Sequence, residues 1–273
     1  MSFHAQTAAE LTSADFDLIR RTLLEAADAA ALETMPRFRT KLAVENKFVV
    51  GFDPVTEADK QAEIAIRDLI AARFPHHGLI GEEWDPKLSE GVFEWIIDPI
   101  DGTRAFISGV PVWGTLIGFM AEGKALAGLM AQPFTGETYL GLPGESHYVR
   151  NGVSEVIRVS DVTELAKAKL STTTPELFNK PDTRKAWEAI RPKVLQTRYG
   201  LDCYAYCLLA AGHIDLVVEA ELKNVDIAPL IPIIVNAGGV ISSWDGGPAE
   251  AGGNCVAAAT QELLDAALEV ING

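Results

Sequence analysis

The sequence is poor in cysteine, in positive charge and in long apolar runs. Its 273 residues include three cysteines, an odd and sparse set that argues against a disulfide framework. No run of about 18 or more apolar residues occurs, which argues against a membrane span. Acidic residues number 38 and basic residues 23, and the resulting net charge of -15 would repel a nucleic-acid duplex. We therefore expect neither a nucleic-acid nor a membrane partner.

The motifs of several common enzyme classes are missing as well. The chain has no Gly-x-Ser-x-Gly elbow, no Walker loop and no histidine pair spaced as on a zinc-binding helix. Serine hydrolases, P-loop nucleotide hydrolases and helix-based zinc enzymes therefore find little support. The segment Met1–Glu10 does not have the basic and apolar parts of a secretory signal, which predicts a cytoplasmic location.

Histidine and cysteine give no strong metal signal. His76 and His77 stand in a loop between Pro75 and Gly78, where we expect both on the surface. Cys203 and Cys207 are one helical turn apart, but no second pair matches them, so buried thiols on a helix are favoured over a zinc site.

What the sequence does contain is the pattern of a folded protein with both helices and strands. Hydrophobic residues make up 48% and charged residues 22%, enough apolar side chains for a substantial core. Short apolar runs in residues 113–142 indicate an antiparallel meander, whereas strands and helices alternate after residue 169. We predict an α+β N-terminal part, residues 1–165, joined to an α/β C-terminal part, residues 166–273.

Periodicity and breaker residues place the individual elements. Thr56 and Asp59, three apart, form a capping-box pattern at the start of the second helix, and Pro232 indicates a kink or break. Helices are expected after Thr12 and Ser13 to about Phe38, bent or interrupted near Pro36, from Thr56 to before Pro75, and at 183–190, 202–211, 227–237 and 260–271. Strands are expected at 44–50, 79–81, 92–97, 113–120, 125–132, 137–142, 169–172, 194–198, 216–220, 240–243 and 255–258.

The most informative stretch is Trp95–Thr103, where an apolar strand ends in two carboxylates three residues apart. Asp98 and Asp101, with the Ile100 carbonyl between them, offer the oxygen ligands that Mg²⁺ prefers. A helix starting after Gly102 would direct backbone N–H groups at the same place, where they could bind phosphate. The alternative is a turn with solvated acids, but an acid directly after a buried strand is costly without a partner.

Further acidic residues have both a metal-binding and a plain structural interpretation. Glu82 and Glu83 are adjacent like charges after a strand, an arrangement that a cation would stabilise, although one of them could be a surface acid. Asp59 and Asp226 each stand at the start of a helix, where capping is the plain interpretation. A residue held as a helix cap is rigid, so capping and function can coexist.

Four motifs taken together resemble the inositol monophosphatase family of metal-dependent, lithium-sensitive phosphatases. They are Asp53–Asp59 (DPVTEAD), Gly81–Glu83 (GEE), Trp95–Thr103 (WIIDPIDGT) and Val225–Pro229 (VDIAP), in that order. The resemblance runs from the first helix to near the C-terminus. It implies a layered αβαβα sandwich, usually a homodimer, that hydrolyses a small phosphate monoester with Mg²⁺.

The resemblance also implies residue roles. Glu82, Asp98 and the Ile100 carbonyl would hold one Mg²⁺, while Asp98, Asp101 and Asp226 would hold a second, and Glu82 could share a third. Thr103, supported by Asp59, would position and help to deprotonate the attacking water. The N–H groups of Gly102 and Thr103 would hold the phosphate.

Departures from the usual family pattern point to a subgroup. Ala105 and Phe106 follow Thr103-Arg104 where the family commonly has Asn, and Val225 replaces a usual Trp. Residues 101–109, 200–206 and 215–219 resemble the histidinol-phosphate phosphatases of this family. In that subgroup the substrate carries an amine and an imidazole rather than a neutral polyol.

The residues proposed to meet that substrate are acidic. Glu219 matches the position that contacts the substrate alcohol in the family, and Asp202 and Glu221 could meet a cation. Helix capping is the plain alternative for Asp202, and a solvated loop for Glu221. Arg104 could reach substrate, pair across a dimer or be exposed.

Three functions stay open at this point. The leading hypothesis is hydrolysis of histidinol phosphate in histidine biosynthesis. The alternative is the same chemistry on inositol monophosphate or a broader range of small phosphates. A non-catalytic dimer that binds cations or phosphate is third, and the Asp59–Thr103 pair argues against it.

Overall fold

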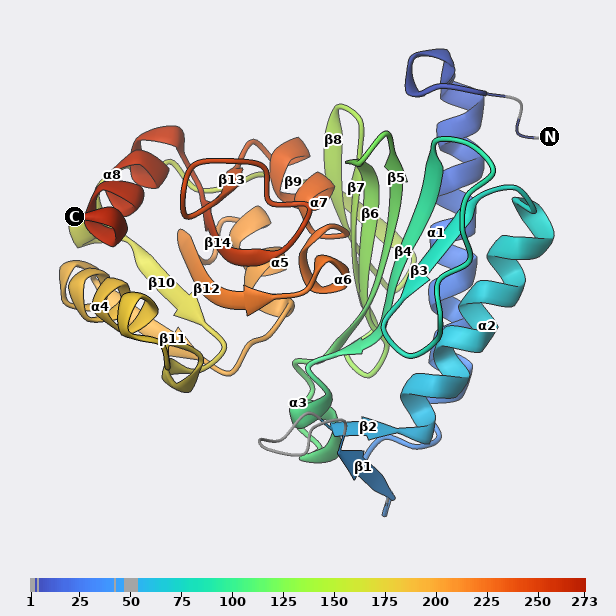
Figure 1. The fold of residues 1–273 in the computed structure, drawn as a ribbon, viewed down its shortest axis with the longest axis horizontal. Helices are drawn as coiled ribbons and strands as arrows, with labels where there is room; N and C mark the ends of the chain where they lie inside the picture. Colours follow the sequence, from blue (N-terminus) through green and yellow to red (C-terminus); the bar gives the residue numbers. More distant parts are fainter. Residues whose placement is uncertain (1–2, 4, 42, 47–53) are drawn as a thin grey trace.

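Five layers of helices and sheets make up the molecule. The structure is a computed structural model that describes residues 3, 5–41, 43–46 and 54–273. Two long helices, a seven-stranded sheet, three short helices, a five-stranded sheet and two further helices follow one another across it (Figure 1). This is the αβαβα sandwich that the resemblance implies, so the predicted fold class is confirmed.

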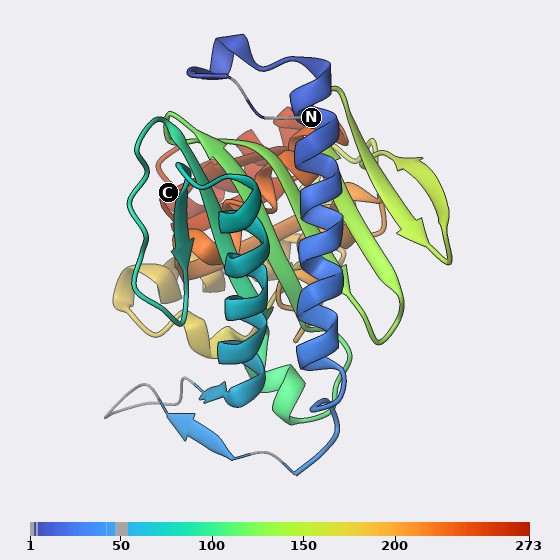
Figure 2. The same cartoon turned by 90° about the vertical axis from the view of Figure 1, so that its right-hand side faces the viewer.

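The outer layer consists of α1 (Ser13–Thr34) and α2 (Glu57–Arg73), which lie side by side on one face of the larger sheet (Figure 2). Both begin with a capping box, from Thr12 to Asp15 and from Thr56 to Asp59, so the second cap is confirmed. The first helix ends at Thr34, short of Phe38, because Pro36 has no amide hydrogen with which to continue the ladder. The interruption predicted near Pro36 is thus confirmed.

The seven-stranded sheet holds the meander that the sequence predicts. Strands β3 and β4 are parallel, and each later strand pairs antiparallel with the one before it. The predicted strand end at Asp98 is wrong, since β4 continues three residues further. Strands β8 and β9 escaped prediction. Only one residue of β8 is buried and none of β9 is, so neither has the apolar face that a strand prediction relies on. The bounds are β3 Gly78–Gly81, β4 Phe93–Asp101, β5 Gly114–Ala121, β6 Lys124–Gln132, β7 Glu137–Leu142, β8 Glu145–Arg150 and β9 Val153–Ile157.

The middle layer is formed by α5 (Tyr204–Ala210), α6 (Asn224–Ile227) and α7 (Ile231–Asn236). The helix expected at 227–237 starts later than predicted: α6 ends at Ile227, residues 228–230 form a turn, and α7 begins at Ile231 with Pro232 in its first turn. The layer packs closely on the sheet: a Cβ added at Gly128 would lie 1.9 Å from the Pro229 carbonyl oxygen. Glycine at that position therefore sets the distance between the two layers.

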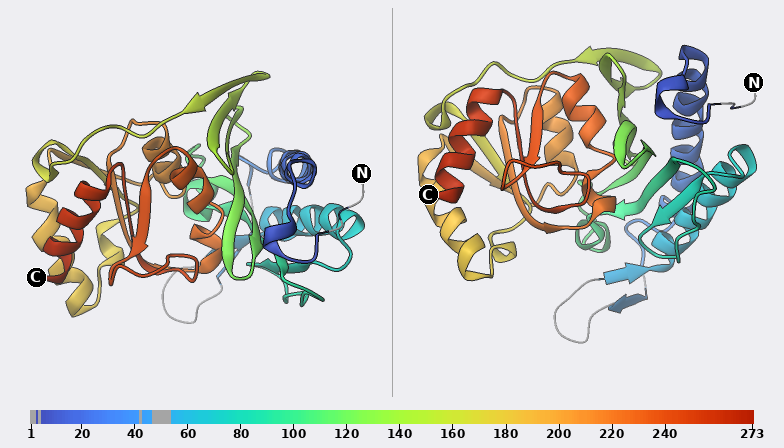
Figure 3. Two further views of the ribbon diagram at one scale, coloured as in Figure 1. Left: turned by 90° about the horizontal axis from the view of Figure 1, so that it is seen from above. Right: turned by 45° about the horizontal axis from the view of Figure 1, so that its top comes forward.

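The C-terminal part contributes the second sheet and the last helical layer, at the far side from α1 and α2 (Figure 3). Strands β11, β10 and β12 are parallel, while β14 and β13 are antiparallel to their neighbours. The predicted strands at 169–172 and 240–243 agree with the structure residue for residue. The bounds are β10 Lys169–Thr172, α4 Pro181–Ile190, β11 Gln196–Tyr199, β12 Leu216–Leu222, β13 Val240–Ser243, β14 Gly253–Ala258 and α8 Gln261–Asn272.

Three small elements lie near one end of β4. They are β1 (Val44–Asn46), β2 (Pro54–Thr56) and the five-residue helix α3 (Thr103–Ile107) (Figure 1). Residues 47–50 of the strand expected at 44–50, and Asp53 of the first family motif, lie outside the described residues. The two large sheets divide the chain between β9 and β10, but separate folding of residues 1–165 and 166–273 stays a prediction.

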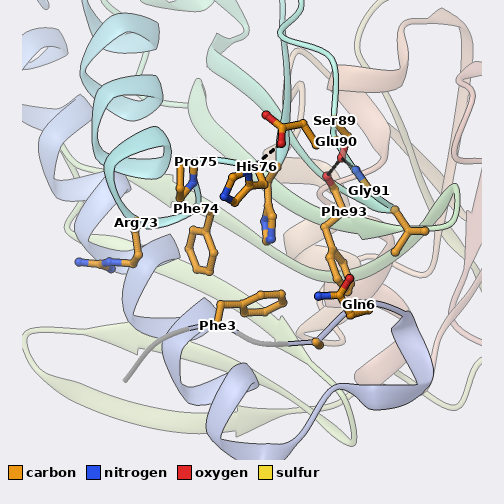
Figure 4. Close-up of a pocket in the computed structure, with 13 residues that line it drawn as sticks. Phe3, Gln6, Arg73, Phe74, Pro75, His76, Ser89, Glu90, Gly91 and Phe93 are labelled. Atoms are coloured by element: carbon orange, nitrogen blue, oxygen red, sulfur yellow. Dashed lines mark hydrogen bonds and ion pairs between the residues drawn. The ribbon is translucent and has the colours of Figure 1, made fainter.

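His77 contradicts its expected place on the surface. Its ring is buried, stacks on Phe74 and meets the edge of Phe3, and the Trp95 indole donates a hydrogen bond to its Nδ1 over 3.1 Å. Burial lowers the pKa of His77 to about 4, and the charge of Lys87 adds to this effect. The neighbouring His76 is exposed and pairs with Glu90 (Figure 4). Both line a cavity of about 460 Å³ beside Phe3, Phe74 and Phe93.

Candidate functional site

A cleft of about 540 Å³ lies where the ends of β4, β12 and β10 meet the starts of α3 and α6. Eight acidic side chains and two basic ones line it among the described residues. A concave site with convergent charged groups is the usual form of a small-molecule site. The acids are Glu82, Asp98, Asp101, Glu176, Asp202, Glu219, Glu221 and Asp226, and the bases are Arg104 and Lys223.

A β-bulge turns Asp98 and Asp101 toward the same side. In β4 these residues are three apart, but their partners in β5, Leu116 and Gly114, are two apart. Residues three apart in a regular strand point to opposite faces, so the one extra residue restores a common direction. Pro99, which cannot donate to the ladder, lies inside the bulge, and the Thr115 hydroxyl donates to its carbonyl over 2.8 Å.

Asp226 completes a tight set of three carboxylates. One oxygen each of Asp98, Asp101 and Asp226 lies within 4.8 Å of the other two. A backbone N–H holds each carboxylate: that of Ile100 for Asp98 over 3.0 Å, that of Cys203 for Asp101 and that of Lys223 for Asp226, both over 2.7 Å. Asp226 is not an N-cap, as the plain interpretation had it, but the third residue of α6.

The electrostatics of this set fit a divalent cation. Burial, together with the charges of Glu82, Asp101 and Asp226, raises the pKa of Asp98 well above its usual range. Burial and the charges of Asp202 and Asp226 do the same for Asp101. Crowded, buried carboxylates are costly to ionise unless a cation neutralises them. An all-oxygen donor set is also the kind that Mg²⁺, Ca²⁺ or Mn²⁺ prefers.

Of the adjacent pair, Glu82 lines the cleft and Glu83 is not among its lining residues. Glu82 lines the cleft and its Oε1 pairs with Lys223 Nζ over 2.8 Å. The Glu83 amide donates to the buried Glu63 over 2.8 Å, and Arg67 pairs with Glu63 over 2.7 Å. The Glu63–Arg67 pair therefore fixes the turn that presents Glu82 to the cleft.

Asp59 serves both interpretations offered by the sequence. Its Oδ2 accepts the cap bonds from the Thr56 amide and hydroxyl, over 2.8 and 2.6 Å. Its Oδ1 lies 3.4 Å from the Thr103 hydroxyl, which also donates to the Ile100 carbonyl over 3.0 Å. Burial raises the pKa of Asp59 to about 6, close to the range of a useful general base.

Gly102 precedes α3 in a conformation that other residues avoid. Its φ is +83°, and an added Cβ would lie 3.1 Å from the Asp202 side chain. Glycine therefore permits the turn and also leaves room for Asp202. The predicted helix after Gly102 is present, although it has only five residues.

Three further predicted residues line the part of the cleft that the C-terminal sheet supplies. Glu219 is buried, accepts the Thr173 amide over 2.6 Å, and has its pKa raised by burial to about 8. Asp202 (φ +46°) and Glu221 (φ +63°) both have left-handed backbones, which is costly outside glycine and occurs often at functional sites. Asp202 is thus not the cap of α5; Cys203 is.

Asp202 and Arg104 influence one another across the cleft. Burial raises the pKa of Asp202 to about 6, and the positive charge of Arg104 works in the opposite direction. Arg104 is exposed on α3 and lines the cleft. Cys203 and Cys207, at the start of and within α5, are buried free thiols, as predicted.

Several cleft residues were not predicted from the sequence. Thr173, Glu176 and Asn179 follow β10, and Lys223 precedes α6. A usable signal was present for the first three, because polar residues directly after a parallel strand meet the ligand edge of an α/β sheet. No comparable signal pointed to Lys223.

The five layers and the carboxylate set at the cleft fit the metal-dependent phosphatases that the sequence resembles. The model of the inositol monophosphatase family matches residues 15–272. The chain therefore belongs to the inositol monophosphatase family.

Named relatives include both inositol and histidinol phosphatases. The bifunctional phosphatase IMPL2, chloroplastic, of Arabidopsis thaliana is 39% identical over 88% of this chain and 68% of its own. A histidinol-phosphatase of Chlorobaculum parvum is 37% identical over 82% of this chain and 85% of its own. A solved inositol monophosphatase of Zymomonas mobilis superposes with a TM-score of 0.84 at 35% identity, over 96% of this chain and 100% of its own.

Proposed function

We propose that the protein is a Mg²⁺-dependent phosphatase that hydrolyses L-histidinol phosphate to L-histidinol and phosphate, a step of histidine biosynthesis. The observation that favours this substrate is an acidic wall, by which we mean the acidic side chains that line the cleft in addition to Asp98, Asp101 and Asp226. Asp202, Glu219 and Glu221 lie there, together with Glu176. A leaving alcohol that carries an ammonium group and an imidazole would neutralise this wall, whereas a neutral polyol would not.

Relatives support the same choice of substrate. Histidinol-phosphatases of Chlorobaculum parvum and two other bacteria are 32% to 37% identical to this chain. The pKa of Glu219, about 8 in its buried place, would fall beside an ammonium group, because an opposite charge favours the ionised form. Burying the substrate cation and ionising Glu219 would thus assist one another.

The metal ligands that we propose are Glu82, Asp98 and the Ile100 carbonyl for one ion, and Asp98, Asp101 and Asp226 for a second. Bound Mg²⁺ supplies charge neutralisation at the phosphate and an acidified water for attack. The protein's own part is to fix the ligands through the β4 bulge and the three backbone hydrogen bonds described above.

The residues that we propose for handling the attacking water are Thr103 and Asp59. The Thr103 hydroxyl would take a proton from the attacking water as it gives its own proton to Asp59 Oδ1, so that hydroxide is formed for the attack on phosphorus. Asp59, with its pKa raised to about 6, is mostly ionised at pH 7 and can take the proton. The N–H groups of Gly102 and Thr103 would hold the phosphoryl oxygens in line with the water. A non-catalytic binder would have no use for this pair.

Inositol monophosphate is the second candidate substrate. The similarity to the inositol monophosphatase of Zymomonas mobilis favours it, since its identity of 35% is close to that of the histidinol-phosphatases. Homodimer formation is a further proposal that rests on the family resemblance, and a cytoplasmic location stays a prediction from the sequence. No helix in the described part of the chain has the length and apolar character to cross a bilayer.

The test is the ratio of kcat/KM for histidinol phosphate and for inositol 1-phosphate, measured side by side with Mg²⁺. We expect a preference of about a hundredfold for histidinol phosphate, which corresponds to roughly 3 kcal/mol between the transition states. A preference for inositol 1-phosphate would be consistent with the proposed phosphatase activity, but it would show that histidinol phosphate is not the preferred substrate.

A further inference from the structure

Lys223 connects the two parts of the chain at the metal side of the cleft. Its ammonium group lies 2.8 Å from Glu82 Oε1, although the residues are 141 positions apart. The Lys223 side chain is 48% exposed and that of Glu82 is 13% exposed. The lysine therefore remains in contact with solvent, while the carboxylate that it neutralises is largely enclosed.

Lys223 combines a backbone that is fixed at the cleft with a long, flexible side chain. Only Arg104 and Lys223 are basic among the described lining residues, and the charge of Arg104 acts on Asp202. The backbone N–H of Lys223 is fixed to Asp226 over 2.7 Å. Its base is thus anchored beside a proposed ligand, while its side chain extends along a flexible stem.

An ammonium group and a divalent cation compete for the same carboxylate. If Glu82 held a cation, the like charge of Lys223 would lie only a few ångströms away, and that repulsion is unfavourable near a protein surface. A phosphate group in the cleft would offer Lys223 a second partner of opposite charge.

We propose that Lys223 is an exchangeable counter-ion. Its ammonium group competes with the divalent cation for Glu82, and it pairs with the substrate phosphate once the cation is bound. The proposal rests on the metal site of the proposed function, but not on the identity of the alcohol. Lys223 would thereby weaken cation binding to the free enzyme and make it depend on phosphate. Cation and phosphate would consequently bind cooperatively.

The experiment measures binding, without turnover. Isothermal titration of the full chain with Mg²⁺, and then with inorganic phosphate at saturating Mg²⁺, compares the wild type with Lys223→Gln. We expect Lys223→Gln to bind Mg²⁺ about fivefold more tightly, near the upper range for a partly exposed ion pair, and to bind phosphate more weakly by a similar factor. Lys223→Arg, which keeps the charge, should resemble the wild type in both titrations.

Lys180→Gln is the matched control. Lys180 also pairs with a cleft carboxylate, that of Glu221, so the substitution removes the same charge from the rim without touching Glu82. We expect its Mg²⁺ affinity to match that of the wild type. Equal tightening in both variants, or unchanged phosphate binding in Lys223→Gln, would overturn the proposal.

The result is independent of the substrate. If histidinol phosphate proved not to be hydrolysed, opposite changes in Mg²⁺ and phosphate affinity would still support the role of Lys223. Thermal unfolding in a chelator shows whether each variant is folded. If Lys223→Gln is not folded, Lys223→Met, which removes the same charge, takes its place with the same expected changes.

Discussion

At the scale of single residues, Asp98 lowers the stability of the fold in the same position where it would serve cation binding. It is 1% exposed and close to three other acids of the cleft. A buried charge near like charges costs folding free energy, and such strain is typical of active sites. The same crowding is what a divalent cation would relieve.

We predict that Asp98→Asn lowers kcat by about a thousandfold or more, because the proposed metals lose a shared ligand. In a chelator, its melting temperature should equal or exceed that of the wild type, since a repelled carboxylate is gone. Phosphate release and thermal unfolding measure the two effects. Glu94→Gln, on the same strand, is the control. A folded Asp98→Asn enzyme with undiminished activity would remove the metal assignment.

Asp202 is suited to test how the alcohol is recognised. Asn tolerates the left-handed backbone of this position (φ +46°) and nearly keeps the side-chain shape. We predict that Asp202→Asn raises KM for histidinol phosphate about tenfold, roughly 1.4 kcal/mol, and leaves KM for inositol 1-phosphate unchanged. Steady-state kinetics with both substrates decide. Equal effects on both would show that Asp202 does not sense the cation.

His77 predicts a pH effect on stability. Its pKa is about 4 in the folded protein and near 6.5 in an unfolded chain. Between these values the unfolded state binds more protons, so the free energy of unfolding falls as the pH drops from about 6.5 to about 4. His77→Gln keeps an acceptor for Trp95 but does not titrate. We predict a shallower fall for this variant by urea unfolding at several pH values.

His76→Gln provides the control for that measurement. His76 is exposed, with 74% of its side chain accessible, so its removal should leave the pH profile nearly unchanged. Parallel pH profiles for the wild type and His77→Gln would show that His77 is not held neutral.

Local sequence predicts some residues well and others poorly. The capping box from Thr56 to Asp59 follows from a spacing of three and needed no tertiary information. The burial of His77 could not be predicted from local sequence, because its partners Phe3, Phe74 and Trp95 come from three separate segments. Lys223 could not be assigned either, since its partner lies 141 residues away.

At the scale of elements, irregular strands shape the site. One extra residue in β4 aligns Asp98 with Asp101, and a second register shift, between Glu219 and Leu222 of β12, accompanies Glu221. Strand prediction assumes strict alternation, so it ended β4 at Asp98 and β12 at Ala220. The bulges were invisible in the sequence because hydrogen-bond register depends on the partner strand.

Gly128 tests the packing of the middle layer on the sheet. We predict that Gly128→Ala lowers the free energy of unfolding by about 2 kcal/mol or more, because backbone rather than a flexible side chain obstructs the new methyl group. Pro229 follows Asp226 by three residues, so Mg²⁺ affinity should fall as well. Denaturant unfolding and titration measure these effects.

Gly91→Ala is the comparison for Gly128→Ala. An added Cβ at Gly91 would meet nothing within 4 Å, so stability and Mg²⁺ affinity should stay close to those of the wild type. Equal stabilities of the Gly91 and Gly128 variants would contradict the close packing of the middle layer.

At the scale of the whole molecule, the proposed ligands come from both large parts of the chain. Asp98 and Asp101 end a strand of the seven-stranded sheet, while Asp226 follows β12 of the five-stranded sheet. The αβαβα order was predictable from the family motifs rather than from periodicity, which indicated only α+β followed by α/β. Asp98 and Asp226 come close together only through tertiary folding, so no local sequence pattern predicts their proximity.

The central claim is that Asp98, Asp101 and Asp226 hold the divalent ions next to the phosphate. The most direct measurement is anomalous scattering from crystals grown with Mn²⁺ and inorganic phosphate. We predict a strong anomalous peak within about 2.4 Å of all three carboxylates, the range of Mn–oxygen bonds by comparison with Mg²⁺ and Ca²⁺, and phosphate beside Gly102. Full occupancy elsewhere, with no peak between these carboxylates, would contradict it.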